Sequence, residues 1–159
     1  MRATRCSRCC AVAADALRAS LLAGAGGTLA ITASTTLEMR LRGRPASQVP
    51  VETVERVLGR ELGPRVRRVA GTAAHLASGL ALGPPRVLLS SIGVREPAAT
   101  LLFGLLASAP DVVIVPALGV TEPPWRWGAT ELAISLAHHL AYAAGASAGL
   151  AVSRARDRG

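Results

Sequence analysis

The 159-residue chain contains no lysine and no asparagine, and aromatic residues make up only 3% of it. All 18 basic residues are therefore arginines, a bias that, with abundant alanine and glycine, is typical of a GC-rich bacterial genome. With so few aromatics, a soluble core would consist almost wholly of Ala, Leu and Val. The net charge of +8 could suggest nucleic acid, but no basic stripe is interleaved with aromatic stacking platforms. We therefore expect no nucleic-acid partner.

Charge is also scarce over residues 69–153. This long stretch contains only seven charged residues: Arg86, Arg95, Glu96, Asp111, Glu122, Arg126 and Glu131. An amphipathic soluble helix shows a charge every turn or two on its wet face, whereas here the arginines flank apolar runs and can act as topology signals. The sequence therefore predicts an all-α, multi-pass protein of a bacterial cytoplasmic (inner) membrane, in contact with the lipid bilayer. A soluble, Ala-rich helical bundle is the alternative.

Four stretches approach the length of about 20 apolar residues that a helix needs to cross the hydrocarbon core. We predict an N-terminal Arg/Cys tail at 1–18, a four-helix transmembrane domain at 19–152 and a basic C-terminal tail at 153–159. The expected spans are 19–37, 69–91, 98–118 and 129–152. Both termini of such a chain lie on one side of the membrane.

The polar loop 40–68 is expected to carry a short amphipathic helix that lies on the membrane surface. Ser47 and Pro50 provide start signals, and apolar residues then recur at helical spacing, at Val51, Val54, Val57, Leu58 and Leu62.

Three local patterns refine this picture. "GPPR" at 83–86 predicts a kink, because proline removes backbone hydrogen bonds. Arg86 follows in the last third of its span, where it could snorkel to the headgroups. Trp125 and Trp127 flank an arginine between two apolar spans, which indicates an interfacial aromatic belt.

The cysteines and the common enzyme motifs offer no catalytic site. Cys6, Cys9 and Cys10 all lie near the N-terminus with no second ligand pair nearby, which excludes a structural zinc site. The chain has no HExxH and no P-loop, and its "GAGG" at 24–27 lies inside an apolar span. We therefore expect no enzyme activity, no cofactor and no metal.

Ionisable residues inside the spans are the candidate functional residues. A charge at the bilayer centre costs on the order of 3 kcal/mol or more, so such residues turn inward, pair, or lie near an end. Glu131, Ser135, His138 and Tyr142 recur at i, i+4, i+7 and i+11 and share one helix face, with His139 at its edge. The candidate polar cluster is His75, Asp111, Glu131, His138, His139 and Tyr142. His75, Asp111 and Glu38 are the candidate partners of the histidine-bearing face, although for Glu38 an ordinary salt bridge with Arg42 at i+4 is the first expectation. Glu131, a few residues after the tryptophans, has an interfacial position as its alternative.

Three functions of this cluster stay open. It could be an interhelical hydrogen-bond network that fixes packing in a non-catalytic protein. It could line the path of a small transporter or channel for an unidentified small molecule or ion. It could belong to an intramembrane metal-dependent enzyme, since Glu and His suit a transition metal.

Rows of small residues would allow helices to approach closely. One row comprises Ala133, Ala137, Ala141, Gly145 and Gly149, and another is Gly79 with Gly83. A homo-oligomer is one use of such rows, but we interpret them as packing.

Four segments resemble the YagU-like family of bacterial inner-membrane proteins and its relatives in GC-rich bacteria. They are "TTLEMRLRGRPASQVP" (35–50), "HLASGLALG" (75–83), "PALGVTEPPWRW" (116–127) and "ELAISLAHHLAYA" (131–143). The resemblance implies a small polytopic membrane protein and implies no known reaction.

Overall fold

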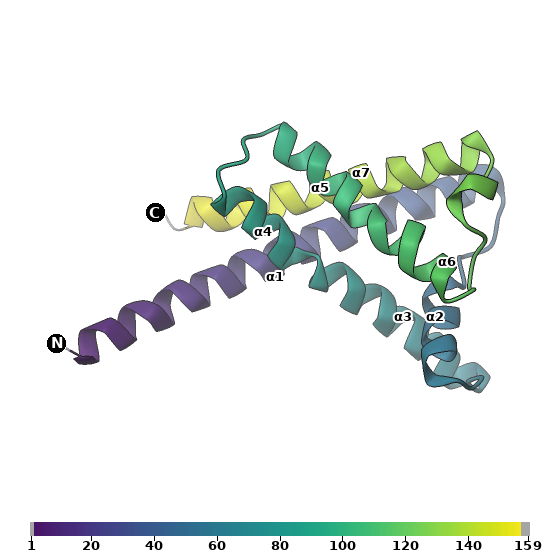
Figure 1. The fold of residues 1–159 in the computed structure, drawn as a ribbon, viewed down its shortest axis with the longest axis horizontal. Coiled ribbons are helices and arrows are strands. Elements are labelled where there is room, and N and C mark those ends of the chain that lie inside the picture. Colours follow the sequence, from purple (N-terminus) through teal and green to yellow (C-terminus); the bar gives the residue numbers. More distant parts are fainter. Residues whose placement is uncertain (1, 157–159) are drawn as a thin grey trace.

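A computed structural model describes residues 2–156, with side chains from residue 12 onward, so the side chains of Cys6, Cys9 and Cys10 lie outside it. The described residues are all-α and include no strand. The elements are, in order, α1 (Arg2–Arg42), α2 (Val49–Leu58), α3 (Pro64–Ala81), α4 (Gly83–Ser91), α5 (Ala98–Ala109), the π-helix η1 (Pro110–Ile114), α6 (Val115–Ala117), the 3₁₀ turn η2 (Pro124–Arg126) and α7 (Ala129–Arg156) (Figure 1).

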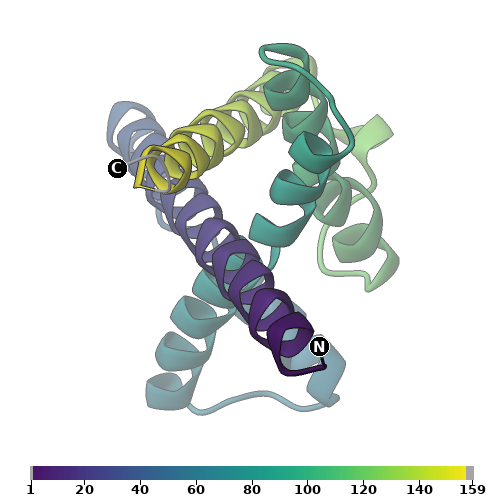
Figure 2. The ribbon, with the colours of Figure 1, turned by 90° about the vertical axis from the view of Figure 1, so that its left-hand side faces the viewer.

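The helices run back and forth along the long axis of the molecule. α1 leads from the N-terminal end to the far end, α3 and α4 return, α5 to α6 run out again, and α7 brings the chain back (Figure 1). Both ends of the chain therefore lie at the same end of the molecule. Figure 2 shows α1 crossing the molecule diagonally, with α7 and α3 on opposite sides of it. The most extensive packing joins α1 to α7, and α5 packs on α7 while α4 packs on α1.

Glycines allow α1 to approach its neighbours this closely. A Cβ atom on Gly24 would lie 2.8 Å from the carbonyl oxygen of Leu80, and one on Gly27 would lie 2.5 Å from the ring of Tyr142. Gly145 and Gly149 of α7 lie in the same way against the backbone of α1. The glycines of the predicted small-residue rows thus pack helix against helix within this chain.

Each predicted span lies on a helical segment. Two of the segments differ from the expected helix, and one shows the break that we predicted. α1 begins at Arg2, so residues 2–18, expected as a separate tail, continue the first helix. The second span is broken at Leu82 into α3 and α4, as the prolines of "GPPR" predicted. The third is straight α-helix only to Ala109 and then widens into the π-helix η1.

The predicted amphipathic helix is α2, and it ends earlier than expected. Gly59 adopts a left-handed conformation (φ +64°) that caps the helix, so Leu62 lies beyond it. Val51 is only 4% exposed because it packs against Gly71 of α3.

Among the described residues, two segments are long and apolar enough to cross a membrane, Val12–Arg42 and Ala98–Ala117. Only 22% and 28% of their apolar windows are buried, whereas a core helix of a soluble protein is mostly buried. The other two expected spans do not meet the same criterion. α3 begins with Arg65, Arg67 and Arg68 and stops at the break, and α7 carries the histidines on its inner face.

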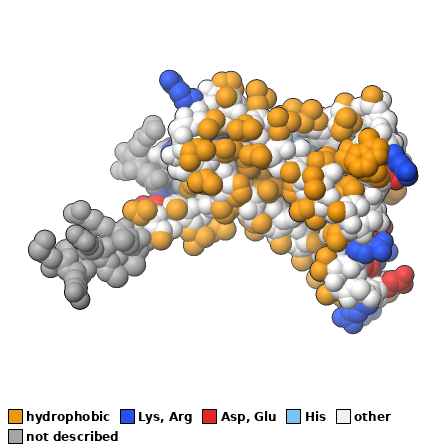
Figure 3. Space-filling model, viewed as in Figure 1, with side chains coloured by type: hydrophobic (Ala, Val, Ile, Leu, Met, Phe, Trp, Pro, Cys, Tyr) orange, Lys and Arg blue, Asp and Glu red, His pale blue; other side chains and the backbone are white. Residues whose placement is uncertain are grey.

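Apolar side chains dominate the outside of the molecule. Twenty-four large hydrophobic residues are exposed, against six that are buried: Val51, Leu89, Phe103, Val115, Tyr142 and Leu150. On the face seen in Figure 3, hydrophobic atoms cover the middle, while most acidic and basic groups gather at the right-hand end.

We predict that Gly145→Ala lowers the stability of the protein. Alanine normally stabilises a helix interior over glycine by about 0.5–1 kcal/mol, but here the added Cβ meets the backbone of Gly26 and the side chain of Ala30. Overpacking of this kind costs roughly 1–3 kcal/mol, so thermal unfolding in detergent should occur at a lower temperature. Gly63→Ala is the control, because no atom lies within 4 Å of its Cβ position. A higher melting temperature for Gly145→Ala would contradict the contact.

Candidate functional site

A groove of about 1810 Å³ opens between the α2–α3 pair and the helices α6 and α7. Residues of α1, η1 and the loop before α7 complete its lining. All six residues of the predicted polar cluster line this groove: His75, Asp111, Glu131, His138, His139 and Tyr142. Helices that are distant in sequence therefore bring these side chains to one cavity, but they do so as separate pairs.

His138 pairs with α1, where it approaches Glu38, one of the three candidate partners, and it does not contact His75 or Asp111. Its Nδ1 lies 2.8 Å from the hydroxyl of Ser34, and its Nε2 lies 4.0 Å from Oε2 of Glu38. The residue is 9% exposed, and Nε2 is buried without a hydrogen-bond partner.

His139 is as buried as His138, at 7% exposed, although we placed it at the edge of the polar face. Its Nδ1 lies 2.8 Å from the carbonyl oxygen of Ser135, and its Nε2 lies 3.5 Å from Oδ2 of Asp111. A carbonyl oxygen only accepts, so Nδ1 carries a hydrogen.

His75 and Tyr142 tie α3 to the other helices. Nε2 of His75 lies 2.9 Å from the hydroxyl of Thr32 on α1. The hydroxyl of Tyr142 donates a 2.5 Å hydrogen bond to the carbonyl of Gly79, and its ring packs against Phe103 at a centroid distance of 5.9 Å. Both are contacts between helices, as in the hydrogen-bond network that was one of the three uses considered for this cluster.

Glu131 does not face the interior with the histidines and instead lies near the start of α7, as its place after the tryptophans also allowed. It lies half-exposed at the end of the groove, where Arg42 donates to its two oxygens at 2.5 and 3.2 Å. Arg42 also contacts Glu38 at 3.1 Å, which confirms the predicted i+4 pair. Arg44 donates from its Nε to both oxygens of Glu38, at 2.7 and 2.8 Å. These four residues form an ion-pair cluster at the groove mouth.

A second polar cluster, which the sequence analysis missed, surrounds Arg86. The arginine is 1% exposed and so does not snorkel to headgroups as expected. It donates to Ser90 at 2.7 Å, to Ser147 at 3.1 Å and to Glu96. A lone arginine in an apolar span, with Ser90 at i+4, was the available signal, but Ser147 lies far away in the sequence.

The environment of Glu96 keeps this partner of Arg86 charged. Partial burial raises the pKa of Glu96, but hydrogen bonds from Thr100 and the positive charge of Arg86 lower it more. The pKa of Glu96 therefore lies below its ordinary value. A charged Glu96 balances the charge of the buried guanidinium.

Ser147 lies in Gly145-Ala146-Ser147-Ala148-Gly149, which has the GxSxG spacing of serine hydrolases and was not noticed in the sequence. The hydrolase motif requires the serine at a sharp strand-to-helix turn, whereas Ser147 lies inside α7. Its hydroxyl donates to the carbonyl of Ala143 and bonds with Thr100 and Arg86. Ser147 therefore helps to pack α7 against α4 and α5. It lacks the strand-to-helix turn that exposes a catalytic serine.

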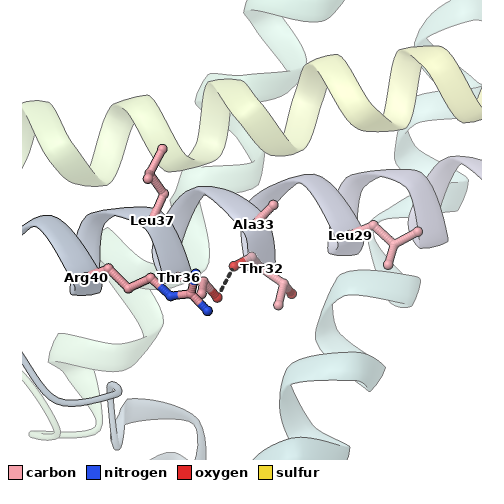
Figure 4. A pocket seen from close by; sticks show the side chains of 6 residues that line it. All are labelled: Leu29, Thr32, Ala33, Thr36, Leu37 and Arg40. Carbon is pink, nitrogen blue, oxygen red and sulfur yellow. Dashed lines mark hydrogen bonds between the residues drawn. The ribbon is translucent and has the colours of Figure 1, made fainter.

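The described part of the chain offers no other place where functional side chains from several elements converge. No group of three or more His, Cys, Asp and Glu side chains could hold a metal ion among those residues. A depression of about 420 Å³ lies on the outer face of α1, lined by Leu29, Thr32, Ala33, Thr36, Leu37 and Arg40 (Figure 4). All six residues come from one helix, and Thr36 donates to the carbonyl of Thr32 in that helix.

We predict that His138→Leu and His139→Leu destabilise the protein to a similar extent. The first leaves the hydroxyl of Ser34 without its partner, and the second leaves Asp111 without its imidazole. Each loss should cost roughly 1–3 kcal/mol, measured as a lower thermal unfolding temperature in detergent. His75→Leu is the control with a smaller expected effect, because His75 is only half-buried. A loss confined to His138→Leu would show that His139 does not face the interior.

Comparisons with family models, with curated proteins and with solved structures found no match. The resemblance to YagU-like proteins therefore stays a prediction, and function is argued from the groove and the surface.

Proposed function

We propose that the chain is an integral protein of a bacterial cytoplasmic membrane that crosses the bilayer four times and has no catalytic activity. The observation that carries this proposal is the outward-facing apolar surface of helices that run along one axis, with ion pairs at their ends. Leu29 of α1 is 72% exposed, and Leu101 and Leu105 of α5 are 55% and 57% exposed. An unpartnered apolar surface of this extent marks contact with a membrane or another protein.

The placement of polar groups on α7 supports a crossing there as well. Its histidines and Tyr142 are buried against other helices, whereas Leu132, Leu136 and Val152 are exposed. Intramembrane ionisable residues characteristically face the bundle interior in this way. Because α3–α4 and α7 run beside α1 and α5, a bilayer around the apolar helices would enclose all four passes.

Membrane residence predicts two results. The protein should stay in the pellet after an alkaline carbonate wash of membranes, because apolar contact with lipid does not depend on charge. Topology reporters fused to the N-terminus and to the C-terminus should give the same signal, because four passes place both ends on one side.

Each result can contradict its part of this proposal. Release of the protein by carbonate would contradict membrane insertion. Opposite signals from the two fusions would contradict an even number of crossings while leaving insertion intact.

A second candidate function, a small transporter, is favoured by the groove itself. The groove opens beside the ion-pair cluster at one end of the bundle and reaches inward as far as Tyr142. Beyond it lies the buried core of Phe103, Ala143 and Ala146, and then the Arg86 cluster at the opposite end. Transporters bind their substrates near the bilayer midplane in a cavity that is open to one side at a time. In a transporter, this groove would be the substrate cavity.

The transporter role predicts that the groove holds water in the membrane. In a chain whose three cysteines are replaced by serine, Ser135→Cys should react rapidly with a membrane-impermeant thiol reagent, because Ser135 lines the groove. Leu105→Cys, on the outward face of α5, is the matched control and should react slowly in lipid vesicles. Equal rates at the two positions would argue against a water-filled groove.

A further inference from the structure

Most charged groups that line the groove are paired with an opposite charge, and Arg68 and Asp111 are the described lining residues that lack a carboxylate or arginine partner. Three of its arginines have carboxylate partners: Arg44 bonds Glu38, Arg67 lies 3.3 Å from Glu55, and Arg126 lies 3.8 Å from Glu122. Arg68, at the start of α3, is exposed at the mouth.

Of the acidic lining residues, Glu131 is held by Arg42 and Glu122 by Arg126. Asp111 lines the groove without an arginine among the described residues.

Asp111 has His139 as its neighbour. The elements that pack against η1 include α5 and α6, and neither contains an ionisable residue. From α7, His139 faces the carboxylate at 3.5 Å. η1 is a π-helix, a form that occurs often at functional sites. Asp111 is therefore a carboxylate presented to a cavity, with one imidazole beside it.

The groove that Asp111 lines also has apolar walls, which suit an apolar ligand. Ile114 and Val115 follow Asp111 in the chain, Val54 and Leu82 line the groove from α2 and the α3–α4 junction, and Trp127 adds an aromatic ring. A carboxylate with apolar and aromatic walls matches a cation that has an apolar body.

His138 offers a second polar contact on the same lining. Its buried Nε2 has no hydrogen-bond partner, although 90% or more of buried polar atoms usually have one. A polar group of a bound ligand would satisfy it.

We propose that the groove binds an organic monocation with an apolar body, whose positive charge is held by Asp111. This inference rests on the proposed transporter role of the groove and names its substrate class. Protonation of Asp111 removes the negative charge that holds the ligand, so the site exchanges a cation for a proton.

The test measures binding of two probes that have nearly the same shape and opposite charge. Tetraphenylphosphonium and tetraphenylborate are equilibrated by dialysis with the full chain in neutral detergent, against protein-free micelles. Asp111→Asn should weaken phosphonium binding by about tenfold or more, as expected when one charge of a pair is removed. It should leave borate binding unchanged or strengthen it, because the charge that attracts a cation repels an anion, and retained borate binding also shows that the variant is folded.

Glu122→Gln is the matched control. Glu122 lines the same groove, but its charge is already paired with Arg126, so phosphonium binding should hardly change. In the unmodified protein, phosphonium affinity should fall as the pH is lowered, and this dependence should be flatter in Asp111→Asn, which has no carboxylate at this position to protonate.

Three outcomes would overturn the inference. Equal losses of both probes in Asp111→Asn would assign the effect to folding or shape. An equal effect of Glu122→Gln would mean that net charge, and not Asp111, attracts the cation. Binding of borate alone would mean that the groove binds an anion, held at the exposed Arg68. Binding of neither probe would remove support for the transporter role as well.

Discussion

The close backbone contact between α1 and its neighbours is the constraint on which the other features of the structure depend. Gly24 and Gly27 allow α3 and Tyr142 to lie against α1, and Gly145 and Gly149 bring α7 to the same helix. The contact needs no large side chains, which suits a chain with only four aromatic residues. Dispersion between closely packed backbones, and not burial of large apolar groups, therefore holds these helices together.

That contact also determines which polar groups meet. Because α7 lies on α1, His138 reaches Ser34 and approaches Glu38, and Glu131 reaches Arg42. Because α3 lies on the other side of α1, His75 meets Thr32. The α2–α3 pair stands away from η1 and α6, and the space between them is the groove. The cavity and its ionisable lining thus follow from how three helices share α1.

The bundle has two polar regions with different character. At the groove mouth, Glu38, Arg42, Arg44 and Glu131 form ion pairs that are partly exposed. At the opposite end Arg86 is completely buried and is balanced by Glu96, Ser90 and Ser147. Removing one partner of such a buried pair leaves an uncompensated charge, so the Arg86 cluster resists separation of α4, α5 and α7. One end of the bundle is therefore closed by buried charge, while the other carries the open groove.

The sequence by itself determined the helical class, the approximate place of the long helices but not where α1 begins, the break at "GPPR" and the pairing of Glu38 with Arg42. These features depend on composition and on residues within a few positions of one another, so local propensity and spacing reveal them. It also grouped the six ionisable and aromatic residues that line the groove. Only the tertiary structure decided their partners: His138 with Ser34, His139 with Asp111, and Arg86 with Ser147. Helix phase predicts which residues share a face, but the partner on the opposing helix depends on the crossing point, which the glycine contacts along α1 establish.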